Sequence, residues 1–358
     1  MVSEGQGPGT LGTPDPIELK TELSPEDALR LNVLLAGDVH AVRIDEGALT
    51  LYALTPKGEA RVSLHRNCRP DLYVTRVREL LGGHALDSPG GYPVHLRRWS
   101  RMGRASPKNL EAMLKLGEPE AVTAVALAPT LTDELARRAW WALPTMEVAR
   151  YMLMQQAVRE GEMGKVLADF LIEHLPFEED PIQAMNSIRA VIGAGLLDAA
   201  EGEQLWAKAK RRPHYFIGFL EHRADDLPAE GERSLPGEVA VQAAAGNAWA
   251  LQLARCYAPS GQSFLHAAEM ALEKPPAHEA VYLLLDILGG YFAAVREAGP
   301  MAGFDREAAA MLALSRLSNA DAEPILTRTT AVGPLMRRHL QPLFEPLLGH
   351  IRILRGQP

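Results

Sequence analysis

The chain has 358 residues, of which 47% are hydrophobic and 23% charged, with a formal net charge of −8. This composition is typical of a globular protein and excludes a disordered or fibrous chain. No apolar run reaches the ~20 residues of a membrane-spanning helix, so we expect no membrane contact. Residues 1–16 lack a basic start and an apolar stretch, which predicts a disordered tail and no secretory signal. Two cysteines cannot build a disulfide framework, so we expect a cytoplasmic protein.

Residues 17–93 predict a small α+β domain. Ser24-Pro25-Glu26-Asp27 has the order of a helix start, with a capping serine, a proline in the first turn and acidic residues behind it. Residues 39–44, 48–54 and 59–64 alternate polar and apolar side chains and are separated by turn residues. This pattern predicts a three-stranded antiparallel sheet, followed by a helix at 71–81.

Residues 94–224 predict a helical-repeat domain, because proline or glycine stands at nearly every joint between short amphipathic segments. Such a series is typical of stacked helical hairpins, so we expect a mainly α fold built as an irregular HEAT-like α-solenoid. The expected helices cover residues 107–116, 118–128, 131–143, 145–157, 162–175, 180–192, 202–212 and 213–223.

Residues 225–237 are polar and contain two prolines, which predicts a linker between the repeat domain and a C-terminal helical domain at 238–358. In the last expected helix, Pro342 and Pro346 should bend or divide the chain. The expected helices of this domain cover residues 238–257, 262–273, 278–297, 305–317, 320–330 and 334–354.

A basic stretch precedes the repeat domain. Residues 61–104 contain nine arginines and three acidic residues, a net charge of +6 in an acidic chain. Near its end, arginines alternate with an indole, as on many RNA-binding surfaces. The simpler interpretation is a solvated connector whose arginines pair with the acidic helices that follow, and no RRM, KH or helix-turn-helix signature is present. The candidate partner-binding residues are Arg97, Arg98, Trp99, Arg101 and Arg104.

Trp140 and Trp141 are adjacent on one predicted helix. Neighbouring residues on a helix point about 100° apart. We therefore expect one indole in the core and the other near the surface, where it is a candidate contact for a partner. Packing in the core is the simpler interpretation for both.

Cys68 is a candidate reactive thiol because Arg66 and Arg69 flank it. With His65 it forms an H-x-x-C pair, but no second pair completes a tetrahedral set, so we expect no metal site. A sulfur-relay or thiol-redox role would place a persulfide on Cys68. Replacing Cys68 with serine tests this role. If the flux of sulfur through its pathway is unchanged in the variant, Cys68 does not act as a relay.

Signatures of catalysis and nucleotide binding are missing from the sequence. There is no Gly-Lys-Ser/Thr run, and the histidines lack the neighbours of a recognisable triad. Glu178-Glu179-Asp180 precedes Pro181, where acidic residues cap a helix more readily than they catalyse. We therefore expect no catalytic residues, no cofactor and no nucleotide.

Four stretches resemble the DsrS family: residues 97–105 (RRWSRMGRA), 116–122 (LGEPEAV), 131–141 (LTDELARRAWW) and 166–179 (VLADFLIEHLPFEE). The resemblance covers about residues 94–227. It implies a soluble cytoplasmic accessory protein, encoded with dissimilatory sulfite reductase in sulfur-oxidising bacteria, with a regulatory role and no established cofactor. We expect a non-enzymatic helical scaffold that binds a protein or RNA partner.

Overall fold

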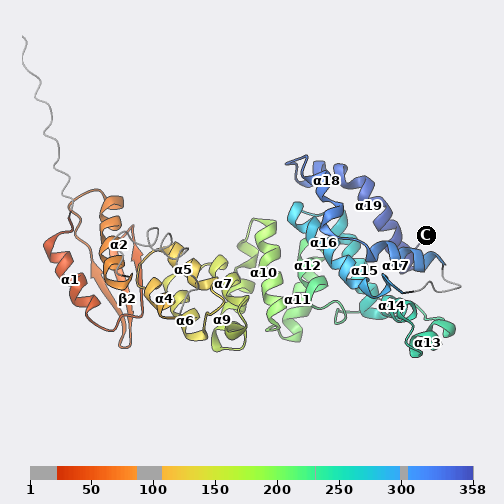
Figure 1. Ribbon diagram of the computed structural model, residues 1–358, viewed down its shortest axis with the longest axis horizontal. Coiled ribbons are helices and arrows are strands. Elements are labelled where there is room, and N and C mark those ends of the chain that lie inside the picture. The colour runs from red at the N-terminus through yellow and green to blue at the C-terminus, as the bar shows by residue number, and fades with distance from the viewer. Residues whose placement is uncertain (1–21, 87–106, 230, 299–304, 358) are drawn as a thin grey trace, which may run out of the picture. The chain divides into compact units, whose positions relative to one another are not determined.

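A computed structural model describes residues 22–86, 107–229, 231–298 and 305–357 of the chain (Figure 1). The chain forms two compact units, one made of residues 1–130 and 137–143 and the other of residues 131–136 and 144–358. The expected tail at 1–16 and the arginine-rich residues 97–104 lie outside the described residues. Within those residues the fold is mainly helical with a small sheet near the N-terminus, which confirms the predicted class.

The first unit begins with α1 (Pro25–Leu35), which Ser24 caps by accepting a hydrogen bond from the Asp27 amide at 3.3 Å. The predicted three-stranded antiparallel sheet follows, in the order β1-β2-β3. Val42 pairs with Ala53 across β1 and β2, and Ala53 pairs with Ala60 across β2 and β3. The strands are β1 (Ala41–Asp45), β2 (Thr50–Thr55) and β3 (Gly58–Ser63).

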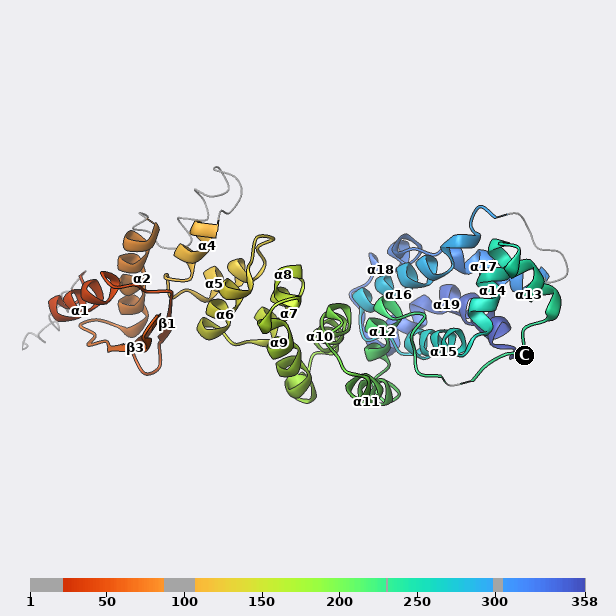
Figure 2. The same ribbon diagram turned by 90° about the horizontal axis from the view of Figure 1, so that it is seen from below.

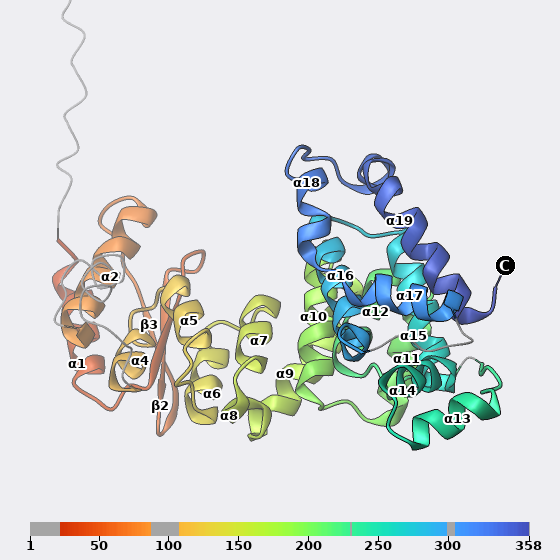
Figure 3. The same cartoon turned by 45° about the vertical axis from the view of Figure 1, so that its right-hand side comes forward.

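Helices α2 (Pro70–Leu86), α4 (Pro107–Met113) and α5 (Pro119–Ala126) complete this unit. Its core packs α1 and α2 against the sheet through buried side chains such as Leu31, Leu51 and Val77. Figure 3 shows the backbone of α1 and α2 beside the strands. Gly117, just before α5, has a φ of +64°, and a Cβ there would lie 2.9 Å from Ile44 Cδ1. A larger residue would therefore be strained twice, by its backbone and by this contact.

Asp27 is a buried polar centre in this unit. Its carboxylate accepts hydrogen bonds from the Tyr73 hydroxyl (2.5 Å), the His65 amide (2.6 Å) and His65 Nδ1 (3.1 Å). Burial raises the pKa of Asp27, but the hydrogen bonds from Tyr73 and His65 outweigh burial and the pKa is lowered overall. The sequence indicated an acidic residue in a first turn, whereas the fold uses Asp27 to join α1, α2 and the loop before α2.

The second unit starts with a run of helices at nearly the predicted positions. The unit boundary passes through α6 (Asp133–Ala142). Asp180 caps α10 by accepting a hydrogen bond from the Ile182 amide at 2.8 Å, as the acidic cluster before Pro181 predicted. The run comprises α7 (Met146–Leu153), α8 (Gln156–Arg159), α9 (Glu162–His174), α10 (Pro181–Ala194), α11 (Ala199–Ala209) and α12 (Phe216–His222), with short 3-10 turns η1 (Leu175–Phe177) and η2 (Pro213–Tyr215).

The C-terminal helices differ from prediction at three joints. The helix expected at 278–297 ends at Tyr291 and is followed by a 3-10 turn, η3 (Ala293–Val295). The helix expected at 238–257 is two helices, because Gly246 has a φ of +83° and the Asn247 side chain caps the next helix. The helix expected at 320–330 is a 3-10 turn and the short α18. The helices are α13 (Gly237–Ala244), α14 (Ala248–Tyr257), α15 (Pro259–Glu273), α16 (His278–Tyr291), α17 (Asp305–Ser315), α18 (Glu323–Leu326) and α19 (Gly333–Arg355).

The prolines of α19 do not divide it. Pro342 and Pro346 lie inside one continuous helix, and both are exposed. The opposite face buries Leu340, Leu347 and Ile351, which hold the helix on the core. The backbone carbonyls that lose a partner at each proline face water, so the helix continues without a break.

The predicted linker at 225–237 lies inside the second unit. A hydrophobic core extends from Leu175 to Leu354 and includes Leu227 within the linker itself. Arg233 donates hydrogen bonds to the carbonyls of Ile353 (3.1 Å) and Leu354 (2.9 Å). Ser263 Oγ also donates to the Pro228 carbonyl at 2.6 Å, so described residues on both sides of position 230 contact the helices of this unit. Figure 2 shows α15 and α19, which pack together in it. Among the described residues, none of the helices combines the length and apolar character needed to cross a membrane.

Candidate functional site

Trp140 and Trp141 are both half-buried, so the expectation that one of them lies fully in the core is wrong. Trp141 donates from Nε1 to the Glu59 carboxylate at 3.2 Å, and the Arg43 guanidinium lies 5.0 Å from its ring centre. Arg43 in turn pairs with Glu59 at 3.0 Å. Trp141 thus packs on the polar face of the sheet, and its contact with a partner stays a prediction.

Cys68 is half-buried and packs against the core of the first unit, with its Sγ 3.6 Å from the Arg69 carbonyl. His65, three residues earlier, directs its Nδ1 to Asp27. In the described part of the chain, no three metal-ligating side chains are grouped closely enough to hold an ion. The arginine-rich candidates from Arg97 to Arg104 lie outside the described residues.

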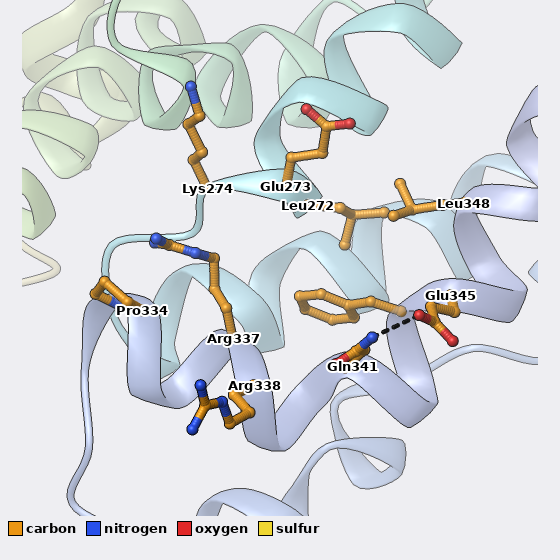
Figure 4. Close-up of a pocket in the computed structure, with 10 residues that line it drawn as sticks. Leu272, Glu273, Lys274, Pro334, Arg337, Arg338, Gln341, Glu345 and Leu348 are labelled. Atoms are coloured by element: carbon orange, nitrogen blue, oxygen red, sulfur yellow. Dashed lines mark hydrogen bonds between the residues drawn. The ribbon is translucent and has the colours of Figure 1, made fainter.

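One open groove of the second unit lies between α15 and α19 (Figure 4). This α15–α19 groove has a volume of about 550 Å³. It forms because α15 ends before Pro275 and Pro276, while α19 continues past that end. Its lining consists of Leu272, Glu273, Lys274, Pro334, Arg337, Arg338, Gln341, Phe344, Glu345 and Leu348.

The lining of the α15–α19 groove follows helical spacing along α19. Positions three and four residues apart share one helix face, so Arg337, Gln341, Glu345 and Leu348 point to the same side. Figure 4 shows the cationic side chains with Pro334 toward one end, and Leu272 and Leu348 together toward the other. The groove therefore has a basic end and an apolar end.

The cations of this groove are available to a ligand. Among the described residues, Lys274, Arg337 and Arg338 have no ion pair. The carboxylates are engaged, because Glu273 lies 3.8 Å from Arg352 and Glu345 accepts a hydrogen bond from the Gln341 amide at 2.6 Å. An acidic group entering the groove would thus meet positive charge that no carboxylate neutralises.

The second groove lies between α7, α10 and α12 and has a volume of about 510 Å³. Within this α7–α10–α12 groove, Arg189 forms two hydrogen bonds to the Glu221 carboxylate, at 2.6 and 2.8 Å. Burial raises the pKa of Glu221, but hydrogen bonds from Arg189 and His222 outweigh it and lower the pKa to about 2. The buried Arg150 donates to Ser187 Oγ at 3.1 Å and lies 3.6 Å from Glu178.

Most titratable side chains of the α7–α10–α12 groove therefore neutralise one another, whereas Arg159, which also lines it, has no ion pair among the described residues. Its hydroxyl group, on Tyr151, donates to the Glu147 carboxylate at 2.9 Å. Groups held in this way stabilise the helices that carry them, and none is arranged as a nucleophile beside a free base. The α15–α19 groove is the stronger binding candidate because its charges are unsatisfied.

Sequence reasoning did not select this groove. Arg337-Arg338 on an amphipathic helix is a visible signal of a basic face. Lys274 is distant in sequence, and only the packing of α15 on α19 brings it beside these arginines. Comparison of the chain with protein-family models, with curated proteins and with solved structures finds no match.

Proposed function

We propose that this chain is a non-enzymatic helical accessory protein that binds an acidic, amphipathic segment of a protein partner in the α15–α19 groove. The observation that carries the proposal is the set of unpaired cations, Lys274, Arg337 and Arg338, beside an apolar floor. An acidic side chain of the partner would pair with the basic end. A neighbouring aliphatic or aromatic side chain would cover the half-buried Leu348.

Charge complementarity favours an acidic peptide over RNA. The whole chain is acidic, so an acidic partner is attracted only where cations gather, which fixes the docking position. Glu273 and Glu345 also line the groove and would repel a continuous phosphate backbone. Phe344 is buried in the floor, so it presents no open face on which a base could stack.

The stacking of successive helices supports a scaffold role. α7 packs on α9, α9 on α10, and α10 on α12. We propose that these helices form an irregular HEAT-like α-solenoid, an architecture whose broad surfaces suit protein binding.

The resemblance to the DsrS family supports a cytoplasmic regulatory role in bacterial sulfur oxidation. Deleting the gene from a sulfur-oxidising bacterium that encodes it is expected to change the amount of dissimilatory sulfite reductase, measured as transcript and protein. Unchanged amounts of both during growth on reduced sulfur would contradict this role.

The groove is tested by selecting peptides from a random display library on the wild-type chain and on Arg337→Glu/Arg338→Glu. We expect the wild type to enrich peptides in which aspartate or glutamate adjoins an apolar residue. The double variant should weaken binding of an enriched peptide at least about tenfold, because two attractive contacts become repulsive. Arg328→Glu is the matched control, since Arg328 is exposed in the same unit and does not line the groove.

Three outcomes would contradict the docking proposal. The first is selection of peptides without acidic residues, and the second is equal weakening in the Arg328→Glu control. The third is competition by single-stranded RNA at lower concentrations than the peptide, which would identify a nucleic-acid surface. Circular dichroism and thermal melting of each variant show whether the fold is retained, so that lost binding is not confused with unfolding.

A further inference from the structure

A smaller basic hollow lies where α11 ends, away from the α15–α19 lining. It has a volume of about 310 Å³. Two short 3-10 turns, η1 and η2, supply its apolar wall, and the end of α11 with the residues after it supplies its charge. The lining consists of Leu175, Pro176, Lys208, Arg211, Arg212 and Tyr215.

The charge of this hollow is unbalanced. Lys208, Arg211 and Arg212 are exposed, the lining has no carboxylate, and within the described ranges none of the three has an ion pair. Like charges held close together repel, and a bound anion would relieve that repulsion. In the α7–α10–α12 groove, by contrast, the carboxylates of Glu221 and Glu178 already neutralise Arg189 and Arg150.

The pKa of the neighbouring His214 responds to the positive charge of this hollow. Its pKa is lowered to about 4, first by burial and then by the charge of Arg212. His214 is therefore neutral at pH 7 and adds no charge of its own. A bound anion would offset the effect of Arg212 and raise the pKa of His214.

Part of the hollow is already ordered for binding. Arg212 donates from Nη1 to the Tyr215 hydroxyl at 2.9 Å, and the Tyr215 side chain is buried. Pro213 begins η2, and its ring fixes the backbone between Arg212 and Tyr215. One guanidinium is thus held in place, which reduces the entropy lost when a ligand binds.

Capping of α11 does not account for all three cations, Lys208, Arg211 and Arg212. Cations near a helix C-terminus interact favourably with the helix dipole, and Lys208 lies in the last turn of α11. Arg211 and Arg212 follow the C-cap residue Lys210, so their side chains are not needed for capping. Helix capping alone therefore leaves two unpaired guanidinium groups unexplained.

We infer that this hollow binds the terminal phosphate of a small ligand, as a phosphomonoester or diphosphate group. Guanidinium groups match phosphate oxygens by bidentate hydrogen bonds, and lysine adds a point charge. A terminal phosphate has close to two negative charges at pH 7, whereas each phosphodiester has one, so three cations fit the terminal group better. The organic part of the ligand would lie on Leu175 and Pro176.

The test is isothermal titration of the full chain with pyrophosphate at constant ionic strength. We expect saturable binding at one site, weakened about tenfold by Arg211→Gln, because a charge-assisted contact is lost. Arg211→Gln/Arg212→Gln should weaken it further, and the control Arg328→Gln should change it less than about twofold. The pKa of His214, measured by NMR, should rise when pyrophosphate is bound.

The inference is overturned by an absence of saturable binding, by equal weakening in the control, or by an unchanged pKa of His214 at saturation. It is also overturned if a single-stranded oligonucleotide with hydroxyl ends displaces pyrophosphate at lower concentration, since that shows recognition of phosphodiesters. Arg211 makes no hydrogen bond through its side chain within the described residues, so Arg211→Gln tests binding without disturbing the fold. None of these results depends on the peptide groove.

Discussion

The α15–α19 groove and the α7–α10–α12 groove have similar volumes, about 550 and 510 Å³, and both contain arginine and glutamate. They differ in how the charges are paired. In the α7–α10–α12 groove, Arg189 and Arg150 each face a carboxylate. In the α15–α19 groove, the half-buried Arg337 and the exposed Arg338 have no ion pair among the described residues.

Because of this difference, we expect the paired charges to contribute to stability and the unpaired charges to contribute to ligand binding. A charge that already has a partner contributes to the folded state, and removing its partner leaves a poorly solvated charge behind. An unpaired surface charge contributes little to stability and is free to meet a ligand. We therefore expect mutations to lower stability mainly in the α7–α10–α12 groove and to change binding mainly in the α15–α19 groove.

The largest expected effect is on stability, from Arg189→Ala. Removing this guanidinium leaves the Glu221 carboxylate, whose side chain is only 24% exposed, without its bidentate partner. We expect the free energy of unfolding in urea at pH 7 to fall by about 3 kcal/mol. The matched change Arg337→Ala should cost less than about 0.5 kcal/mol. Equal losses of unfolding free energy in the two variants would contradict the idea that paired charges stabilise the fold more than unpaired ones.

The next effect is a pH dependence due to Glu221. Its pKa in the folded protein is about 2, below the ordinary value of 4.5. A lowered carboxyl pKa contributes stability above about pH 4.5, and this contribution is lost as the pH falls through about 2. We expect Glu221→Gln to cost about 2 kcal/mol at pH 7, after allowance for partial exposure. Urea titrations should show the gap to wild type closing between these pH values, and a constant gap would contradict the assignment.

A smaller loss of stability is expected for Glu178→Gln. The Glu178 carboxylate is 3.6 Å from Arg150, which keeps its hydrogen bond to Ser187. We therefore expect a loss of about 1 kcal/mol in unfolding free energy, measured in urea at pH 7. Glu203→Gln, at an exposed position of α11, serves as the control for removal of one negative charge. A loss as large as that of Arg189→Ala would show that Arg150 depends on this pair alone.

The smallest effect is on binding in the α15–α19 groove. Glu273→Gln/Glu345→Gln removes two negative charges from the lining and leaves the cations in place. An acidic peptide selected on the wild type should then bind about two- to threefold more tightly at low salt, and the gain should shrink as salt is added. Fluorescence anisotropy of a labelled peptide measures the affinity and its dependence on salt. Weaker binding would mean that these glutamates contact the peptide directly.

Much of the fold follows from local sequence signals. Ser24-Pro25 starts α1 and Asp180-Pro181 starts α10, because capping and proline geometry act over a few residues. The strands follow from alternation and turn residues. The division of α13 from α14 was missed, although Gly246-Asn247 contains the signal of a helix end and a new cap.

The candidate sites were harder to predict. Trp141 stood out in the sequence, but its indole is engaged by Glu59 on the sheet. The docking cations and the phosphate-binding candidates are ordinary surface residues in sequence, and their importance depends on whether a carboxylate lies nearby. That information comes from contacts between distant segments, which one sequence does not provide.

The sequence by itself determined where most helices and strands begin, because capping residues, prolines and turn residues act on their neighbours in the chain. The tertiary structure decided that residues 225–237 join the helical core instead of separating two cores, since Arg233 reaches carbonyls about 120 residues away in the chain. It also decided which charges are paired. Ion pairing depends on distances between side chains, and packing alone sets those distances.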